Sequence, residues 1–91
     1  DFLTNLVCNL LEEGNTLFKD GEWERAVREF SEGLNVSRYG AADNIRIPAA
    51  LLESLYVNRA AAYYSMVREH FLAGCKDLNI YPSKCIFLNR E

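Results

Sequence analysis

The hydrophobic positions of this chain recur at intervals of three and four residues, which is the period of an amphipathic helix. The first such run occupies residues 1–18 and its apolar positions are Leu3, Leu6, Val7, Leu10, Leu11, Leu17 and Phe18. The pattern breaks at Lys19-Asp20-Gly21, because glycine tolerates positive φ and aspartate can hydrogen-bond to its own backbone. The period resumes at Trp23 and continues to about Val36. These residues predict two helices joined by a tight polar turn.

The second half of the chain predicts two further helices. Residues 37–47 lose the helical period and contain Gly40, Asp43 and Asn44, which is typical of a loop. Pro48 then suits the first turn of a helix over residues 49–66. A fourth helix is expected at about 68–80, in a register that buries an apolar face including Cys75 and ends at residues 81–82.

Composition and charge place this sequence among globular domains. It has 91 residues, of which 49% are hydrophobic and 25% charged, and its net charge is −3, so nothing favours direct binding to nucleic acid. The longest apolar stretches fall short of the ~18 residues of a membrane span. No secretory signal is visible and the chain begins at Asp1. We expect part of a longer cytoplasmic or nuclear protein.

Chemistry-bearing residues are few and scattered. Cys8, Cys75 and Cys85 are odd in number and fit no zinc-binding spacing, so reduced thiols are expected. His70 precedes Cys75 closely, but two candidate ligands do not make a metal site. No glycine-rich phosphate loop or nucleophile elbow is present in the sequence. We therefore predict no catalytic residue, metal or cofactor, and no enzymatic activity.

The first hairpin resembles a tetratricopeptide repeat, a unit of about 34 residues. The positions that carry the likeness are Gly14, Leu17, Gly21, Trp23, Ala26 and Phe30. Gly14 takes the small position where the partner helix crosses, and Gly33 stands where alanine is usual. A mid-helix glycine costs about 1 kcal/mol relative to alanine, so Gly33 indicates close contact between helices. The resemblance implies an all-α fold of stacked antiparallel hairpins whose function lies on a surface.

A second repeat is indicated by residues 55–63, LYVNRAAAY, where Ala60 takes the position of Gly14. The separation exceeds a standard repeat by about 12 residues, which the predicted loop accounts for. We expect one domain over residues 1–91. Its parts are a first repeat at about 7–37, a loop insertion at about 38–48, a second repeat at about 49–82 and the start of a third at 83–91. Because about three repeats are usual for stability, marginal stability or self-association is expected.

Some tetratricopeptide domains hold the acidic C-terminal tail of heat-shock chaperones in a carboxylate clamp of amides and cations. By this resemblance Asn15 and Asn58 match the two clamp asparagines, and Lys84 could supply a cation of the third repeat. Leu11 stands where a cation is expected, which weakens the clamp. We predict a peptide-binding surface formed by these four residues and Ala62. The alternative is that the two asparagines hydrogen-bond to a neighbouring helix.

A second resemblance is to the repeat region of RoXaN-type CCCH zinc-finger proteins. It rests on EEGNTLF and SEGLNV, on a long loop bounded by Tyr39 and Pro48, and on LYVNRAA. It implies a module that recruits a protein or peptide partner, with any RNA binding left to other parts of the parent. Three functions therefore stay open, namely peptide binding in a groove, a chaperone-type carboxylate clamp, and a structural repeat that self-associates.

Overall fold

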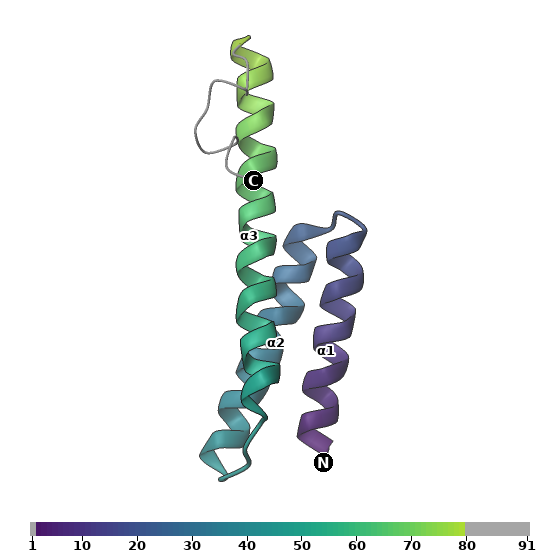
Figure 1. Ribbon diagram of the computed structural model, residues 1–91, viewed down its shortest axis with the longest axis vertical. Coiled ribbons are helices and arrows are strands. Elements are labelled where there is room, and N and C mark those ends of the chain that lie inside the picture. The colour runs from purple at the N-terminus through teal and green to yellow at the C-terminus, as the bar shows by residue number, and fades with distance from the viewer. Residues whose placement is uncertain (1, 80–91) are drawn as a thin grey trace.

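The chain forms three helices and no strand within residues 2–79, the part that the structure, a computed structural model, describes. Helix α1 spans Phe2–Lys19, α2 spans Trp23–Ala42 and α3 spans Ala49–Leu78. Helices α1 and α2 form an antiparallel hairpin. Helix α3 packs along α2, antiparallel to α2 and parallel to α1 (Figure 1). The predicted all-α fold is confirmed at this level.

The first hairpin turns where the sequence predicts. Gly21 has a φ of 79°, and the Glu22 N–H donates to the Leu17 carbonyl over 2.9 Å. A residue other than glycine would be strained at this φ, because its Cβ meets the neighbouring backbone. Phe18 and Trp23 then close the end of the hairpin edge to face, with ring centroids 4.9 Å apart. Local sequence therefore fixes the angle at which α2 returns along α1.

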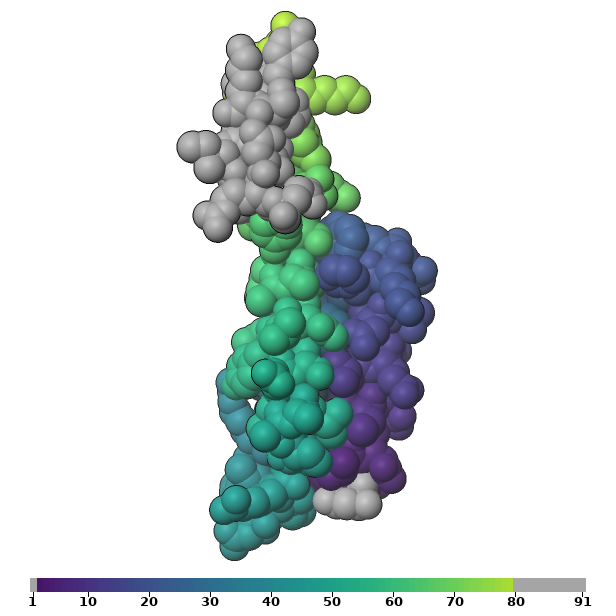
Figure 2. Space-filling model, viewed as in Figure 1, coloured from purple at the N-terminus to yellow at the C-terminus, as the bar shows by residue number. Residues whose placement is uncertain are grey.

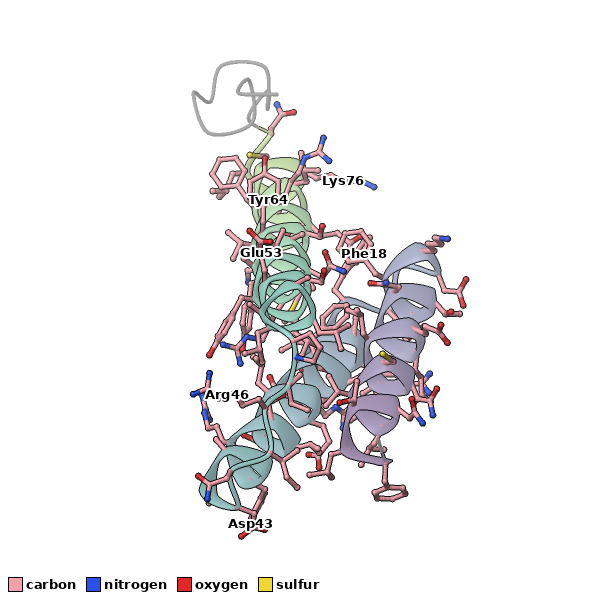
Figure 3. All side chains as sticks on the ribbon, turned by 60° about the horizontal axis from the view of Figure 1, so that its bottom comes forward. Phe18, Asp43, Arg46, Glu53, Tyr64 and Lys76 are labelled. Atoms are coloured by element: carbon pink, nitrogen blue, oxygen red, sulfur yellow. The ribbon has the colours of Figure 1, made fainter. Side chains whose placement is uncertain are left out.

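Helix α2 is longer than predicted and ends at Ala42, inside the expected loop. Its end is set by Asn44, whose φ is 65°, and by the Ile45 N–H, which donates to the Gly40 carbonyl over 2.8 Å. A left-handed residue followed by a hydrogen bond to the carbonyl five residues back is a common helix stop. The irregular connection to α3 is therefore confined to residues 43–48 (Asp43 and Arg46 are labelled in Figure 3).

Two glycines allow the helices to approach closely. A Cβ at Gly14 would stand 2.7 Å from the Phe30 Cδ1 atom, and one at Gly33 would stand 3.0 Å from the Leu55 Cδ2 atom. The predicted close contacts at Gly14 and Gly33 are therefore confirmed. The core that forms around these crossings comprises Val7, Ala26, Val27, Phe30, Leu34, Ile47, Leu55 and Ala62.

The predicted second hairpin is wrong, because α3 continues without a break through residues 66–70. In an alignment of the two repeats without gaps, Val67 takes the position of Gly21, and β-branched residues strongly disfavour positive φ. Helix α3 instead ends at Leu78 and is followed by the capping residue Asn79, which has a φ of 58°. Ala60 is consequently exposed rather than held at a helix crossing, and Leu78 is 71% exposed.

Helix α3 therefore extends beyond the other two helices (Figure 2). Its 30 residues correspond to a length of about 45 Å. The first two thirds of α3 supply Leu55 and Ala62 to the core, and Met66 packs against it. The predicted third repeat at residues 83–91 lies outside the described residues.

Candidate peptide-binding surface between the first and third helices

Asn15 and Asn58, the two asparagines that the family resemblance singled out, meet across helices α1 and α3. The Asn58 Nδ2 group donates a hydrogen bond to the Asn15 Oδ1 atom over 2.7 Å, and both residues are half-buried. Asn15 follows the crossing glycine Gly14, and Asn58 lies one turn after the buried Leu55. Packing of both helices against α2 thus brings two amides from distant parts of the chain into contact.

This amide pair retains hydrogen-bonding capacity beyond its mutual bond. An asparagine side chain has two N–H donors and a carbonyl acceptor with two lone pairs. After the bond between them, Asn15 keeps its amide donors and Asn58 keeps its carbonyl oxygen. A donor and an acceptor on one half-buried pair can serve the C=O and N–H groups of a peptide backbone. The bond between Asn58 and Asn15 also agrees with the alternative interpretation of the sequence, in which the two asparagines hydrogen-bond to a neighbouring helix.

The other predicted surface residues have different positions. Leu11 is half-buried and packs against the core. Ala62 is fully buried in the core, so its predicted contact with a peptide is wrong. Ala62 lies where α3 packs against the hairpin of α1 and α2. Lys84 lies outside the described residues.

The cation nearest in sequence to the pair, Arg59, is directed to α2. Its Nη1 atom donates to the Ser31 Oγ atom over 3.2 Å, and its guanidinium lies 5.7 Å from the Tyr56 ring centroid. This arrangement holds Arg59 away from α1. A carboxylate clamp needs a cation beside Asn15. The position expected for that cation is occupied by the apolar Leu11, and Arg59 bonds to Ser31 on α2 instead.

Acidic side chains meet on the other flank of the hairpin. Burial raises the pKa of the Glu29 carboxyl, and the negative charge of Glu13 and a hydrogen bond with Glu13 raise it further, while Arg25 opposes the shift. The raised pKa reflects the cost of holding two carboxylates together where solvation is incomplete. Sequence reasoning missed this contact because Glu13 and Glu29 lie on different helices.

A concave region lies elsewhere, between the start of α2 and the middle of α3. Its lining includes Trp23, Arg28, Met66, Glu69 and His70, and the Trp23 Nε1 group donates to the Glu69 Oε2 atom over 3.3 Å. Acidic and basic groups are mixed there, so its charge selects no ligand class. No local pattern could have predicted the contact between Trp23 and Glu69.

Metal-ligating side chains do not gather in the described part of the chain. Within residues 2–79, no group of three or more His, Cys, Asp and Glu side chains is close enough to hold a metal ion. His70 is exposed whereas Cys75 is buried. None of the three described helices is both long and apolar enough to cross a membrane.

Comparison with known proteins relates this chain to CCCH zinc-finger proteins. It is 48% identical over 65 residues to human zinc finger CCCH domain-containing protein 7B, and 34% identical over 92 residues to human zinc finger CCCH domain-containing protein 7A. These alignments cover 71% and 99% of this chain but only 7% and 10% of the two human proteins. No family profile and no solved structure matches the chain. The relatives agree with the resemblance to RoXaN-type CCCH proteins, whereas the tetratricopeptide assignment stays a prediction.

Proposed function

We propose that this chain is a protein-interaction module that binds an extended segment of a partner protein across α1 and α3. The observation that carries the proposal is the half-buried hydrogen bond between Asn58 and Asn15. A polar pair held between two packed helices costs desolvation, and a peptide that bonded to the remaining amide donors and carbonyl acceptor of the pair would offset this cost.

The chemistry of the pair favours a peptide backbone over a charged group. The amide donors of Asn15 suit a backbone carbonyl, and the carbonyl of Asn58 suits a backbone N–H, so one peptide unit can engage both residues. The neighbouring Leu11 offers an apolar contact for a side chain of the ligand. We therefore expect a segment with an apolar anchor close to the peptide unit that meets the two asparagines.

A chaperone-type carboxylate clamp is the competing function. A carboxylate brought against Leu11 would lose hydration without gaining a cation, which is costly for a charged group. Arg59 donates a hydrogen bond to Ser31 of α2 and packs over the ring of Tyr56. Two amides alone would hold a terminal carboxylate weakly, so we expect weak or no binding of an acidic tail.

The CCCH zinc-finger relatives give the proposal its context. Their names describe proteins with CCCH zinc-finger domains, and this chain is similar to a small part of each. We infer that in such a protein this segment recruits a protein partner, while nucleic-acid contacts belong to other domains. The net charge of −3 is consistent with this division.

The test compares two peptides of equal length by isothermal titration and by amide chemical shifts. One peptide ends in an acidic chaperone-type tail with a free carboxylate. The other carries a leucine anchor and an amidated end. The anchored peptide should bind more tightly, and Asn58→Ala should weaken its binding about tenfold, equivalent to about 1.4 kcal/mol. Asn9→Ala is the matched control, because Asn9 is exposed on α1 and lies about 120° around the helix from Asn15.

Two results would contradict the proposal. Low-micromolar binding of the acidic tail that Asn58→Ala abolishes would establish the clamp instead. Chemical-shift changes confined to α2, with none near Asn15 or Asn58, would place the binding surface elsewhere. If the acidic tail does not bind, Leu11→Lys should create measurable affinity, since a charged hydrogen bond contributes about 1.5–3 kcal/mol.

A further inference from the structure

Two arginines lie along the seam where α3 packs against α2. The Arg59 Nη1 atom of α3 donates to the Ser31 Oγ atom of α2 over 3.2 Å. The Arg38 Nη1 atom, about two turns further along α2, donates to the Asn35 Oδ1 atom over 3.3 Å. Ser31, Asn35 and Arg38 follow one another at intervals of four and three residues, so they share one side of α2. We call these four residues, together with Tyr56 of α3, the arginine seam.

The positive charges of the arginine seam are not neutralised within residues 2–79. Both arginines bond to neutral side chains, and neither forms a salt bridge in this part of the chain. Glu32 follows Ser31 directly but lies about 100° around the axis of α2 from it. Glu53 lies about 120° around the axis of α3 from Arg59. The seam therefore carries two positive charges on a chain whose net charge is −3.

Arg59 is held in place before any ligand binds. Its guanidinium lies 5.7 Å from the Tyr56 ring centroid, so the aromatic ring and the Ser31 hydroxyl both fix its position. Arg59 and Ser31 are half-buried, whereas Tyr56 is 49% exposed. A cation that is already positioned loses little conformational entropy on binding, and partial burial strengthens its attraction to an anion.

The arginine seam presents hydrogen-bond donors to a ligand. An arginine side chain has five N–H donors and no acceptor, and the two bonds occupy one nitrogen of each arginine. The Ser31 hydroxyl accepts from Arg59 and keeps its own proton to donate. The Asn35 oxygen accepts from Arg38, so its amide N–H groups are also donors. A matching ligand must bring acceptors with negative charge, and carboxylates meet both conditions.

We propose that the arginine seam binds an acidic segment of a partner protein, with one side-chain carboxylate at Arg59 and a second at Arg38. Ser31 and Arg38 are about 10.5 Å apart along α2, and Arg59 lies at the level of Ser31. An extended segment covers about 10 Å in three residues, so acidic residues with two residues between them match this spacing. Tyr39 is 78% exposed and lines a cleft together with Arg38. Tyrosine and arginine are the residue types that often dominate the binding energy of an interface.

The arginine seam is distinct from the peptide-binding surface of α1 and α3. Arg59 follows Asn58 directly, but the two side chains lie about 100° apart around α3 and bond to different helices. Asn58→Ala removes the polar pair with Asn15 and leaves the arginine seam in place, so the two surfaces can be tested separately. Because charge complementarity drives the association, we expect binding at the seam to weaken as the salt concentration rises.

The test uses the full 91-residue chain and a short peptide with two glutamates that are separated by two residues. Both ends of the peptide are blocked, so the glutamates are its only anions, and a control peptide has glutamine at both positions. Titration is followed by the chemical shifts of the backbone amides and of the arginine Nε–H groups. The glutamate peptide should shift the signals of Ser31, Arg38 and Arg59. The glutamine peptide should bind at least about tenfold more weakly.

Three arginine variants locate the site. Arg59→Gln should weaken binding of the glutamate peptide about tenfold, and Arg38→Gln, at an exposed position, about threefold to fivefold. Arg25→Gln is the matched control, because Arg25 is exposed on α2 and lies about 120° around the helix axis from Ser31. Circular dichroism establishes that each variant folds, and Arg38→Gln keeps the test decisive if Arg59→Gln unfolds. Asn58→Ala should leave the binding of the glutamate peptide unchanged.

Three results would overturn the proposal. Equal binding of the two peptides would show that carboxylates are not what the surface selects. Equal effects of Arg38→Gln and Arg25→Gln, or loss of binding in Asn58→Ala alone, would place the peptide outside the arginine seam. A single-stranded RNA that binds more tightly than the glutamate peptide, and that loses affinity in Arg59→Gln, would assign the seam to nucleic acid instead of an acidic segment.

Discussion

Gly14→Ala should destabilise the domain even though alanine is the better helix former. An alanine Cβ at this position would stand 2.7 Å from the Cδ1 atom and 2.9 Å from the Cζ atom of Phe30. Phe30 is fully buried, so its ring cannot turn into solvent. Overpacking costs about 1–3 kcal/mol, and the better helix propensity returns up to about 1 kcal/mol. A net loss of about 1–2 kcal/mol is expected from these two opposing effects.

Two other helical glycines provide matched controls with the same chemical change. At Gly33 the new Cβ would meet the Cδ2 atom of Leu55 at 3.0 Å, and the end of a leucine can shift, so Gly33→Ala should be close to neutral. At Gly74 no atom of residues 2–79 would lie within 4 Å of the new Cβ, so Gly74→Ala should stabilise α3 by up to about 1 kcal/mol. The order of stability should therefore follow the available space rather than helix propensity, which is the same in all three cases.

Urea unfolding monitored by circular dichroism measures all three variants. Thermal midpoints should differ by about 4–8 °C for each kcal/mol in a domain of this size. The double variant Gly14→Ala/Phe30→Leu should recover part of the loss, because a smaller side chain admits the methyl group. If Gly14→Ala is as stable as Gly33→Ala and shows no coupling to Phe30, the close crossing of α1 and α2 is not what requires glycine.

Two further predictions concern charge and the turn. Because the folded pKa of Glu29 is raised, its protonation stabilises the fold as pH falls, and this contribution is lost as pH rises through the folded pKa. Glu13→Gln should therefore raise the free energy of unfolding more at about pH 7.5 than at about pH 5, whereas Glu12→Gln, on the exposed side of α1, should not, and equal effects of the two would refute the coupling. Gly21→Ala should cost about 1–2 kcal/mol in urea unfolding because of the positive φ alone, since no atom of residues 2–79 would lie within 4 Å of its Cβ. Gly21→Asn should cost less, and an equal loss for both would argue against a conformational cause.

The first hairpin could be predicted because its signals are local. The periodic apolar face of α1, the polar break that ends in Gly21 and the aromatic pair at the hairpin end all lie within a few residues of one another. The close approach of the helices at Gly33 could also be predicted, because a glycine inside a helix usually indicates that another helix packs closely against it. The end of α2 was misjudged because loop-type residues such as Gly40 also occur inside a helix where another side chain packs closely. A Cβ at Gly40 would stand 3.2 Å from the Leu3 Cδ1 atom.

The candidate site was predictable only in part, because its contacts join distant segments. The family resemblance placed Asn15 and Asn58 on neighbouring helices, and the structure brings them into hydrogen-bond contact. The bond from Arg59 to Ser31 had no counterpart in the sequence pattern, and it decides that the local cation faces α2. Ala62 was misplaced because the position of a small residue in a helix does not reveal whether it faces the core or a groove.

Helix α3 is continuous because the residues after Met66 favour a helix, although the repeat resemblance predicted a turn there. A second hairpin needs a residue that accepts positive φ after Met66, and Val67, Arg68 and Glu69 all favour a continuing helix or resist such a turn. Residues 68–78 therefore extend past α1 and α2 instead of folding back onto the earlier part of α3.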